Sequence, residues 1–215
     1  MLAVTKEYIY EPHEFSDFVI TYDDARFNVH KYVLARYSEY FSAMLKGDRS
    51  MTEIQLPMVR IYHDRRARTH SSFNKWLLAV YDDEIIVAGD FFTKVKDETP
   101  SNKKDWGILM DFTQYFGCNK LSDALKAATI AILGMNIKNK SELFFMLIRV
   151  EGVKWTTIAE QVIDQIGKNF RNIINASDYY TLYWEQLPTA TRDRIVKVAF
   201  EHGQLDDNVK RNYKT

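Results

Sequence analysis

The spacing of hydrophobic and polar positions changes within residues 16–47. Residues 18–21 read Phe-Val-Ile-Thr, an alternating and β-rich run with the period of two of a strand. The pair Asp23-Asp24 supplies a turn, and residues 26–29 can return as a second strand. This part of the chain therefore predicts a β-hairpin.

After the hairpin, apolar residues recur every three and four positions, which places them on one face of a helical stretch. Ser38 interrupts that stretch, and its hydroxyl can accept a hydrogen bond from an amide at the start of a second helix. The predicted unit is hairpin, helix, helix. The apolar positions of the two helices are Val33, Leu34, Tyr37, Phe41, Met44 and Leu45.

Apolar patterns continue to residue 134. Ile54 and Leu56 alternate with a polar residue and predict a short strand. Further patterns predict three helices, with a strand after the first; these elements fall at 73–81, 84–87, 108–116 and 121–132. The residues expected to begin or end elements are Pro57, Ser71 or Ser72, Gly117 and Gly134.

The opening stretch resembles the first half of a BTB/POZ domain, and the helix, turn and strand near residues 73–87 resemble a later landmark of that family. The resemblance implies an α+β fold, in which a small β-sheet is capped by a cluster of helices. It also implies that the chain binds proteins, often a second copy of itself. The residues that carry the first resemblance are Asp17, Phe27, His30, Lys31, Val33, Leu34, Ser38, Tyr40, Phe41 and Met44.

These observations predict a BTB/POZ domain over residues 1–134, with inserted loops near 57–72 and 88–104. Residues 135–203 are helical in pattern throughout and resemble a shortened BACK region, the helical extension that often follows BTB domains. Residues 204–215 form a polar tail. Within the helical region, Thr189 after Pro188 is predicted as a cap and Gly203 as a helix stop.

The chain carries 29 basic and 29 acidic residues, so no overall charge favours nucleic acid or an acidic membrane. Its single cysteine, Cys118, excludes an internal disulfide and favours a reducing compartment. No apolar run approaches the length needed to span a bilayer, and the first residues do not resemble a signal peptide. We expect a soluble protein in the cytoplasm or the nucleus.

No motif predicts an enzyme, a metal site or a cofactor. The five histidines form no HxxxH or HExxH pair, and the eight glycines form no phosphate-binding loop. Cys118 has no neighbouring histidine and is predicted as a small buried residue, while His30 is predicted to be structural. The arginines in residues 60–68 are interpreted as a solvated loop.

The BTB resemblance also implies particular interface residues. Tyr8 and Tyr10, in an alternating segment before the hairpin, match a strand that pairs with the partner subunit. Asp17 and Lys31 match a charged pocket near the dimer interface. Candidates for facing a cullin of the third type, which recruits substrates to a ubiquitin ligase, are Tyr40, Phe41, Met44, Met51 and Glu53.

The sequence thus predicts a protein-interaction and self-association module. We expect a homodimer that serves as an adaptor, with a cullin-type ubiquitin ligase and an unknown target protein as candidate partners. The first alternative is a dimerising scaffold, or a competitor of other BTB proteins, that binds no ligase. Nucleic-acid binding through residues 60–68 is a less favoured alternative.

Overall fold

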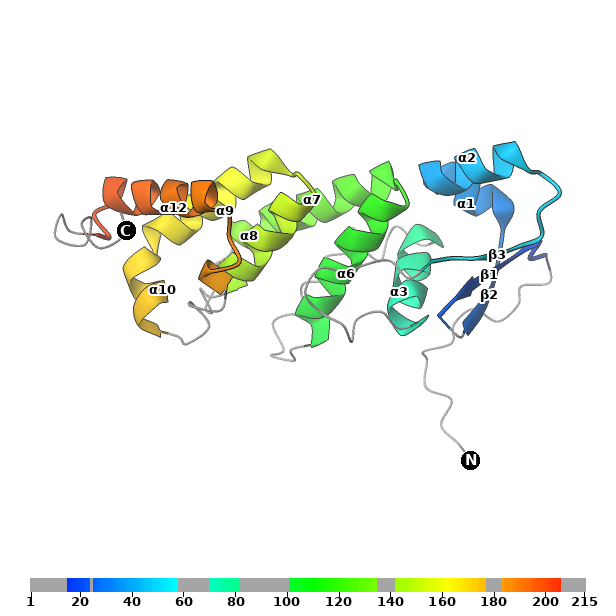
Figure 1. Cartoon of the computed structure of the whole chain (residues 1–215), viewed down its shortest axis with the longest axis horizontal. Coiled ribbons are helices and arrows are strands. Elements are labelled where there is room, and N and C mark those ends of the chain that lie inside the picture. The colour runs from blue at the N-terminus through cyan, green and yellow to red at the C-terminus, as the bar shows by residue number, and fades with distance from the viewer. Residues whose placement is uncertain are drawn as a thin grey trace, which may run out of the picture. The chain divides into compact units, whose positions relative to one another are not determined.

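The computed structural model describes residues 15–23, 25–57, 70–81, 101–134, 142–176 and 183–205 (Figure 1). The chain divides into two compact units, residues 1–128 and 129–215, and the division falls inside helix α7. The segment with Tyr8 and Tyr10, the strand expected at 84–87 and the basic stretch 60–68 lie outside the described residues.

The predicted hairpin is confirmed. Strands β1 (Phe18–Tyr22) and β2 (Ala25–Val29) pair antiparallel, and Asp23 takes the left-handed turn conformation with φ of 55°. The expected third strand is β3 (Glu53–Gln55), which pairs in parallel with β1 and gives the order β2-β1-β3. Since β1 and β3 are parallel, the connection between them must cross over, and it includes two helices.

Those helices are α1 (Lys31–Tyr37) and α2 (Glu39–Gly47), separated at Ser38 as expected. Helix α3 (His70–Tyr81) packs against both the sheet and α6 (Ser101–Tyr115), and α7 (Asn119–Leu133) follows after a short turn (Figure 1). These elements enclose the aromatic core of the first unit.

Aromatic rings from distant parts of the chain meet in that core. Tyr22 of β1 stacks on Phe73 of α3 with ring centroids 4.7 Å apart. The ring centroids of Trp76 and Phe116 lie 4.5 Å apart, and Phe116 stacks on Phe41 of α2 with centroids 5.3 Å apart. These large apolar surfaces are removed from water, which is the main favourable term in folding. The same contacts fix α2 against the end of α6.

The second unit is helical in its described residues, as the pattern predicted. It contains α8 (Glu142–Gly152), α9 (Thr156–Lys168), α10 (Phe170–Ala176) and α12 (Thr189–Glu201). Helices α9 and α12 approach closely, because a Cβ atom on Gly167 would lie 2.4 Å from Val198 Cγ1. Arg194 of α12 also forms an ion pair with Glu160 of α9.

Several predicted boundaries are wrong. Helix α3 begins at His70, so Ser71 and Ser72 lie inside it and do not belong to the loop predicted near 57–72. The loop expected at 88–104 extends too far, because α6 begins at Ser101. Thr189 is the first residue of α12 and not its cap, a position that Pro188 occupies. Proline has no backbone N–H, but a residue that precedes the first turn is not required to donate a hydrogen bond within the helix, so proline is tolerated there.

Candidate functional site

The N-terminus of α2 meets the C-terminal end of α6. The Ser38 hydroxyl accepts a hydrogen bond from the Phe41 amide at 3.2 Å and donates one to the Phe116 carbonyl at 2.5 Å. The Glu39 amide donates to the Gly117 carbonyl at 3.1 Å. Amides in the first turn of a helix have no partner within it, and carbonyls in the last turn have none either. Here the two helix ends satisfy each other, and the predicted cap at Ser38 is confirmed.

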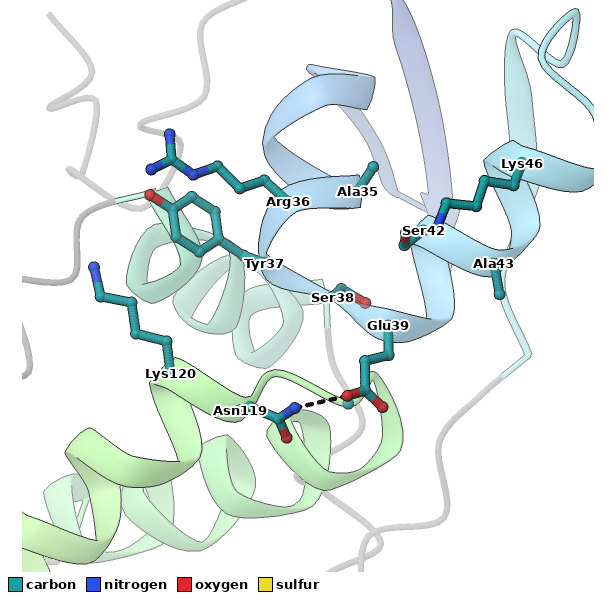
Figure 2. A pocket seen from close by; sticks show the side chains of 11 residues that line it. Ala35, Arg36, Tyr37, Ser38, Glu39, Ser42, Ala43, Lys46, Asn119 and Lys120 are labelled. Atoms are coloured by element: carbon teal, nitrogen blue, oxygen red, sulfur yellow. Dashed lines mark hydrogen bonds between the residues drawn. The ribbon is translucent and has the colours of Figure 1, made fainter.

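A hollow of about 560 Å³ lies over this junction, between α1, α2 and the turn from α6 to α7 (Figure 2). Gly117 has a positive φ of 61°, and a Cβ atom there would lie 3.0 Å from the Glu39 Cβ. Asn119 Nδ2 donates a hydrogen bond to Glu39 Oε1 at 2.6 Å. The turn can therefore approach α2 closely because residue 117 has no side chain.

Asp17 and Lys31, expected in a charged pocket, do lie together. Asp17 Oδ1 accepts a hydrogen bond from the backbone amide of Lys31 at 2.8 Å, at the first residue of α1. The Lys31 ammonium instead donates to the Arg49 carbonyl at 3.2 Å and lies 5.9 Å from the centre of the Phe18 ring. An acidic and a basic group thus share one exposed surface.

Two exposed aromatic residues lie close to this pair in the sequence, and the sequence reasoning missed both. Phe15 is 81% exposed and Tyr32 is 71% exposed. The signal was present in the pattern, because Tyr32 lies off the apolar face that begins at Val33 and Leu34. A large aromatic side chain outside the buried face of its helix is a candidate for a binding contact.

Of the five cullin-facing candidates, Phe41 is fully buried, and its side chain therefore belongs to the core. Tyr40, Met44 and Met51 are partly accessible. Desolvation, and secondly the neighbouring Tyr115, raise the pKa of Tyr40 above its usual 10.0. The phenol is therefore neutral at physiological pH, as an ordinary tyrosine also is, and it can donate a hydrogen bond.

Glu53, the remaining candidate, is exposed on the face of the sheet away from the core. Its carboxylate lies 3.3 Å from the Arg26 guanidinium, which reaches it from β2 on the far side of β1. Both side chains are largely exposed, so this ion pair contributes little stability. The structure does not bring Glu53 to the junction of α2 and α6, and it already has a local partner.

Cys118 is buried, as predicted, and burial raises the pKa of its thiol to about 12. The thiol is therefore protonated at physiological pH and is a poor nucleophile. Among the described residues, no group of three or more His, Cys, Asp or Glu side chains could hold a metal ion. None of the described helices combines the length and the hydrophobicity that crossing a membrane requires.

Comparison with known sequences identifies the fold. A search of curated proteins finds no match. A family model described as the BTB/POZ domain matches residues 7–130, which is more than half of the chain. The match covers the three-stranded sheet, the helices α1, α2, α3 and α6, and most of α7, and it ends before the region predicted to be BACK-like. The chain therefore belongs to the BTB/POZ domain family, whose members are protein-interaction modules.

Proposed function

We propose that this protein-interaction module associates with a second copy of itself through the surface around the start of α1. The single observation that carries the proposal is the exposure of Phe15 and Tyr32, which are sequence neighbours of the hydrogen-bonded pair Asp17 and Lys31. Large aromatic residues are enriched at the centres of protein interfaces, where they contribute much of the binding energy.

The charges on this surface also suit self-association. In a twofold interface the same patch occurs on both subunits, so residue i of one copy meets residue j of the other and the reverse. A patch that carries both an acidic Asp17 and a basic Lys31 can satisfy that condition with two equivalent contacts. A patch of one charge sign would instead repel its own copy.

Light scattering coupled to size-exclusion chromatography tests this proposal on the full chain at micromolar concentration. We expect the mass of a dimer for the unaltered protein. Tyr32→Ser and Phe15→Ser should each weaken the dimer by about 30-fold, the effect of removing one strong aromatic contact. Ile130→Ser is the matched control, because Ile130 is also an exposed apolar residue but lies outside the patch. A strict monomer for the unaltered chain would refute the proposal.

A cullin-type ligase adaptor is the second candidate, favoured by the partial accessibility of Tyr40 and Met44 on α2. A pull-down with the N-terminal part of a third-type cullin tests it. Met44→Glu should abolish capture while leaving the fold intact, whereas Phe41→Ala is uninformative because Phe41 is a core residue. If the unaltered chain captures no cullin, the remaining assignment is a dimerising scaffold or a competitor of other BTB proteins.

The other expectations stay predictions. A non-enzymatic role agrees with membership of a protein-interaction family and with the protonated state of the Cys118 thiol. A cytoplasmic or nuclear location rests on the presence of one cysteine that has no partner for a disulfide within the chain. Nucleic-acid binding was assigned to residues 60–68, which lie outside the described residues and lend it no structural support.

A further inference from the structure

The hollow over the junction of α2 and α6 combines small residues on its floor with basic side chains on its rim (Figure 2). We propose that this hollow binds a short acidic segment of a partner protein. The inference rests on the protein-binding role of the family. It does not depend on self-association, because no residue of the patch at the start of α1 lines the hollow, although the two surfaces adjoin where Arg36 contacts Tyr32.

The floor is open because its residues are small. Ser42 and Ala43 lie on the exposed side of α2, one turn before Lys46, and Ala35 of α1 lies opposite them. Gly117 completes the floor from the turn after α6. The volume, about 560 Å³, lies within the range of roughly 300–1,000 Å³ that is typical of ligand sites. The space accommodates several side chains of a bound segment.

The rim carries three basic side chains and one acidic side chain. The Arg36 guanidinium lies 5.3 Å from the centre of the Tyr37 ring, and the Lys120 ammonium lies 5.6 Å from the centre of the same ring. Figure 2 shows these two side chains near Tyr37, with Lys46 at the other end of the hollow. A carboxylate bound near this ring would be attracted by both cations.

The one acidic residue of the rim, Glu39, is already engaged. Asn119 Nδ2 donates to its carboxylate at 2.6 Å, which directs Glu39 toward the start of α7 (Figure 2). The basic residues therefore outnumber the acid by two along the rim. A segment with two or more carboxylates would match this balance, whereas a basic segment would meet repulsion at both ends of the hollow.

The same features argue against nucleic acid as the occupant. Binding to a phosphate backbone requires a continuous basic surface, and the chain as a whole carries no net charge. Here Glu39 interrupts the basic rim between Lys46 and Lys120. A short peptide can place single carboxylates at the two ends and leave the middle of the hollow to apolar or backbone groups.

Fluorescence anisotropy with the full chain tests the proposal. The probe is a fluorescein-labelled octapeptide of alternating Glu and Ala, and the matched peptide replaces each Glu with Gln. We expect saturable binding of the Glu peptide only, weakened several-fold when salt rises from 50 to 300 mM, because exposed charges are screened. Lys46→Glu and Lys120→Glu should each weaken binding by roughly two- to fivefold, the effect expected for the loss of an exposed charge pair.

Two further variants separate a shaped site from diffuse attraction. Ala43→Trp fills the floor without changing any charge, and it should abolish binding. Lys197→Glu is the control, because Lys197 is an exposed lysine on α12 of the second unit, and it should bind like the unaltered chain. Arg36 is left unaltered because its guanidinium also lies 3.4 Å from the Tyr32 hydroxyl, next to the proposed dimer surface.

The proposal is overturned if the Gln peptide binds equally well, if the Glu peptide does not bind at 50 mM salt, or if Ala43→Trp binds normally. Tighter binding of a thymidine oligonucleotide than of the Glu peptide would also overturn it. Light scattering on the same samples reports self-association separately. If the chain is a dimer but does not bind the Glu peptide, only the acidic-segment proposal is contradicted. If the chain is a monomer that binds the Glu peptide, only the self-association proposal is contradicted.

Discussion

Replacing Ser38 with alanine removes two hydrogen bonds at the junction of α2 and α6. The hydroxyl caps α2 by accepting from the Phe41 amide, and it also donates to the Phe116 carbonyl. Ser38 is almost fully buried, so water cannot readily replace the lost partners. We expect Ser38→Ala to destabilise the first unit without removing any large apolar contact.

The expected loss of unfolding free energy follows from these two hydrogen bonds. Loss of a serine cap costs about 1 kcal/mol of unfolding free energy, and loss of a typical second hydrogen bond costs about 1 kcal/mol. The Phe116 carbonyl still accepts from the Tyr40 amide at 3.3 Å, so it keeps one donor. We therefore expect a loss of about 2 kcal/mol, which lowers the Tm by about 4–8 °C for a chain of this length.

Urea unfolding followed by circular dichroism measures the loss, and hydrogen exchange at the Phe41 amide locates it. Ser42→Ala is the matched control, because it makes the same change one turn later on α2, where alanine is the better helix former. That control should be neutral or slightly stabilising. Equal unfolding midpoints for Ser38→Ala and Ser42→Ala, with unchanged exchange at Phe41, would refute the junction as a source of stability.

Two further predictions concern other sites. Gly167→Ala should destabilise the second unit by about 1–3 kcal/mol in urea unfolding, because the added Cβ atom would lie 2.4 Å from Val198 Cγ1. Gly152→Ala is the control and should be tolerated, because a Cβ atom there would have no neighbour within 4 Å outside its own stretch of helix. The Cys118 thiol has a pKa raised from 9.0 to about 12, so the folded chain keeps a proton that the unfolded chain loses. The contribution of this thiol to the unfolding free energy should therefore be constant below pH 9 and fall above it, and Cys118→Ala should flatten the profile between pH 9 and 10.

Local patterns were enough to predict the hairpin, the break at Ser38 and most helices. They work because strand alternation, helical period and capping depend on residues a few positions apart. The junction could not be predicted in this way. It joins Ser38 to Phe116 across 78 positions, and nothing in either segment alone specifies the other. Boundaries such as the start of α12 also failed, because a proline and a following threonine are both plausible at a helix start.

Phe41 shows where two kinds of inference conflicted. Its spacing from Leu34 and Leu45 placed it on the buried face of the helices, while the family resemblance suggested a partner-facing role. The structure agrees with the spacing, since all three side chains are buried. Family resemblance identifies which helix is near an interface, but the period of the helix decides which of its residues can reach a partner.

The stability of the first unit and ligand binding in the hollow should be linked, because both depend on the close approach of the turn after α6 to α2. Gly117 lets the turn reach α2, which completes the hydrogen bonds to the helix start and also closes one side of the hollow. A ligand that binds only the folded chain stabilises it by about 2.7 kcal/mol at a hundredfold excess over its Kd. An acidic segment in the hollow would contact α1, α2 and the turn after α6, and should therefore stabilise the first unit. Thermal unfolding of the second unit should stay unchanged, since no residue of the hollow belongs to it.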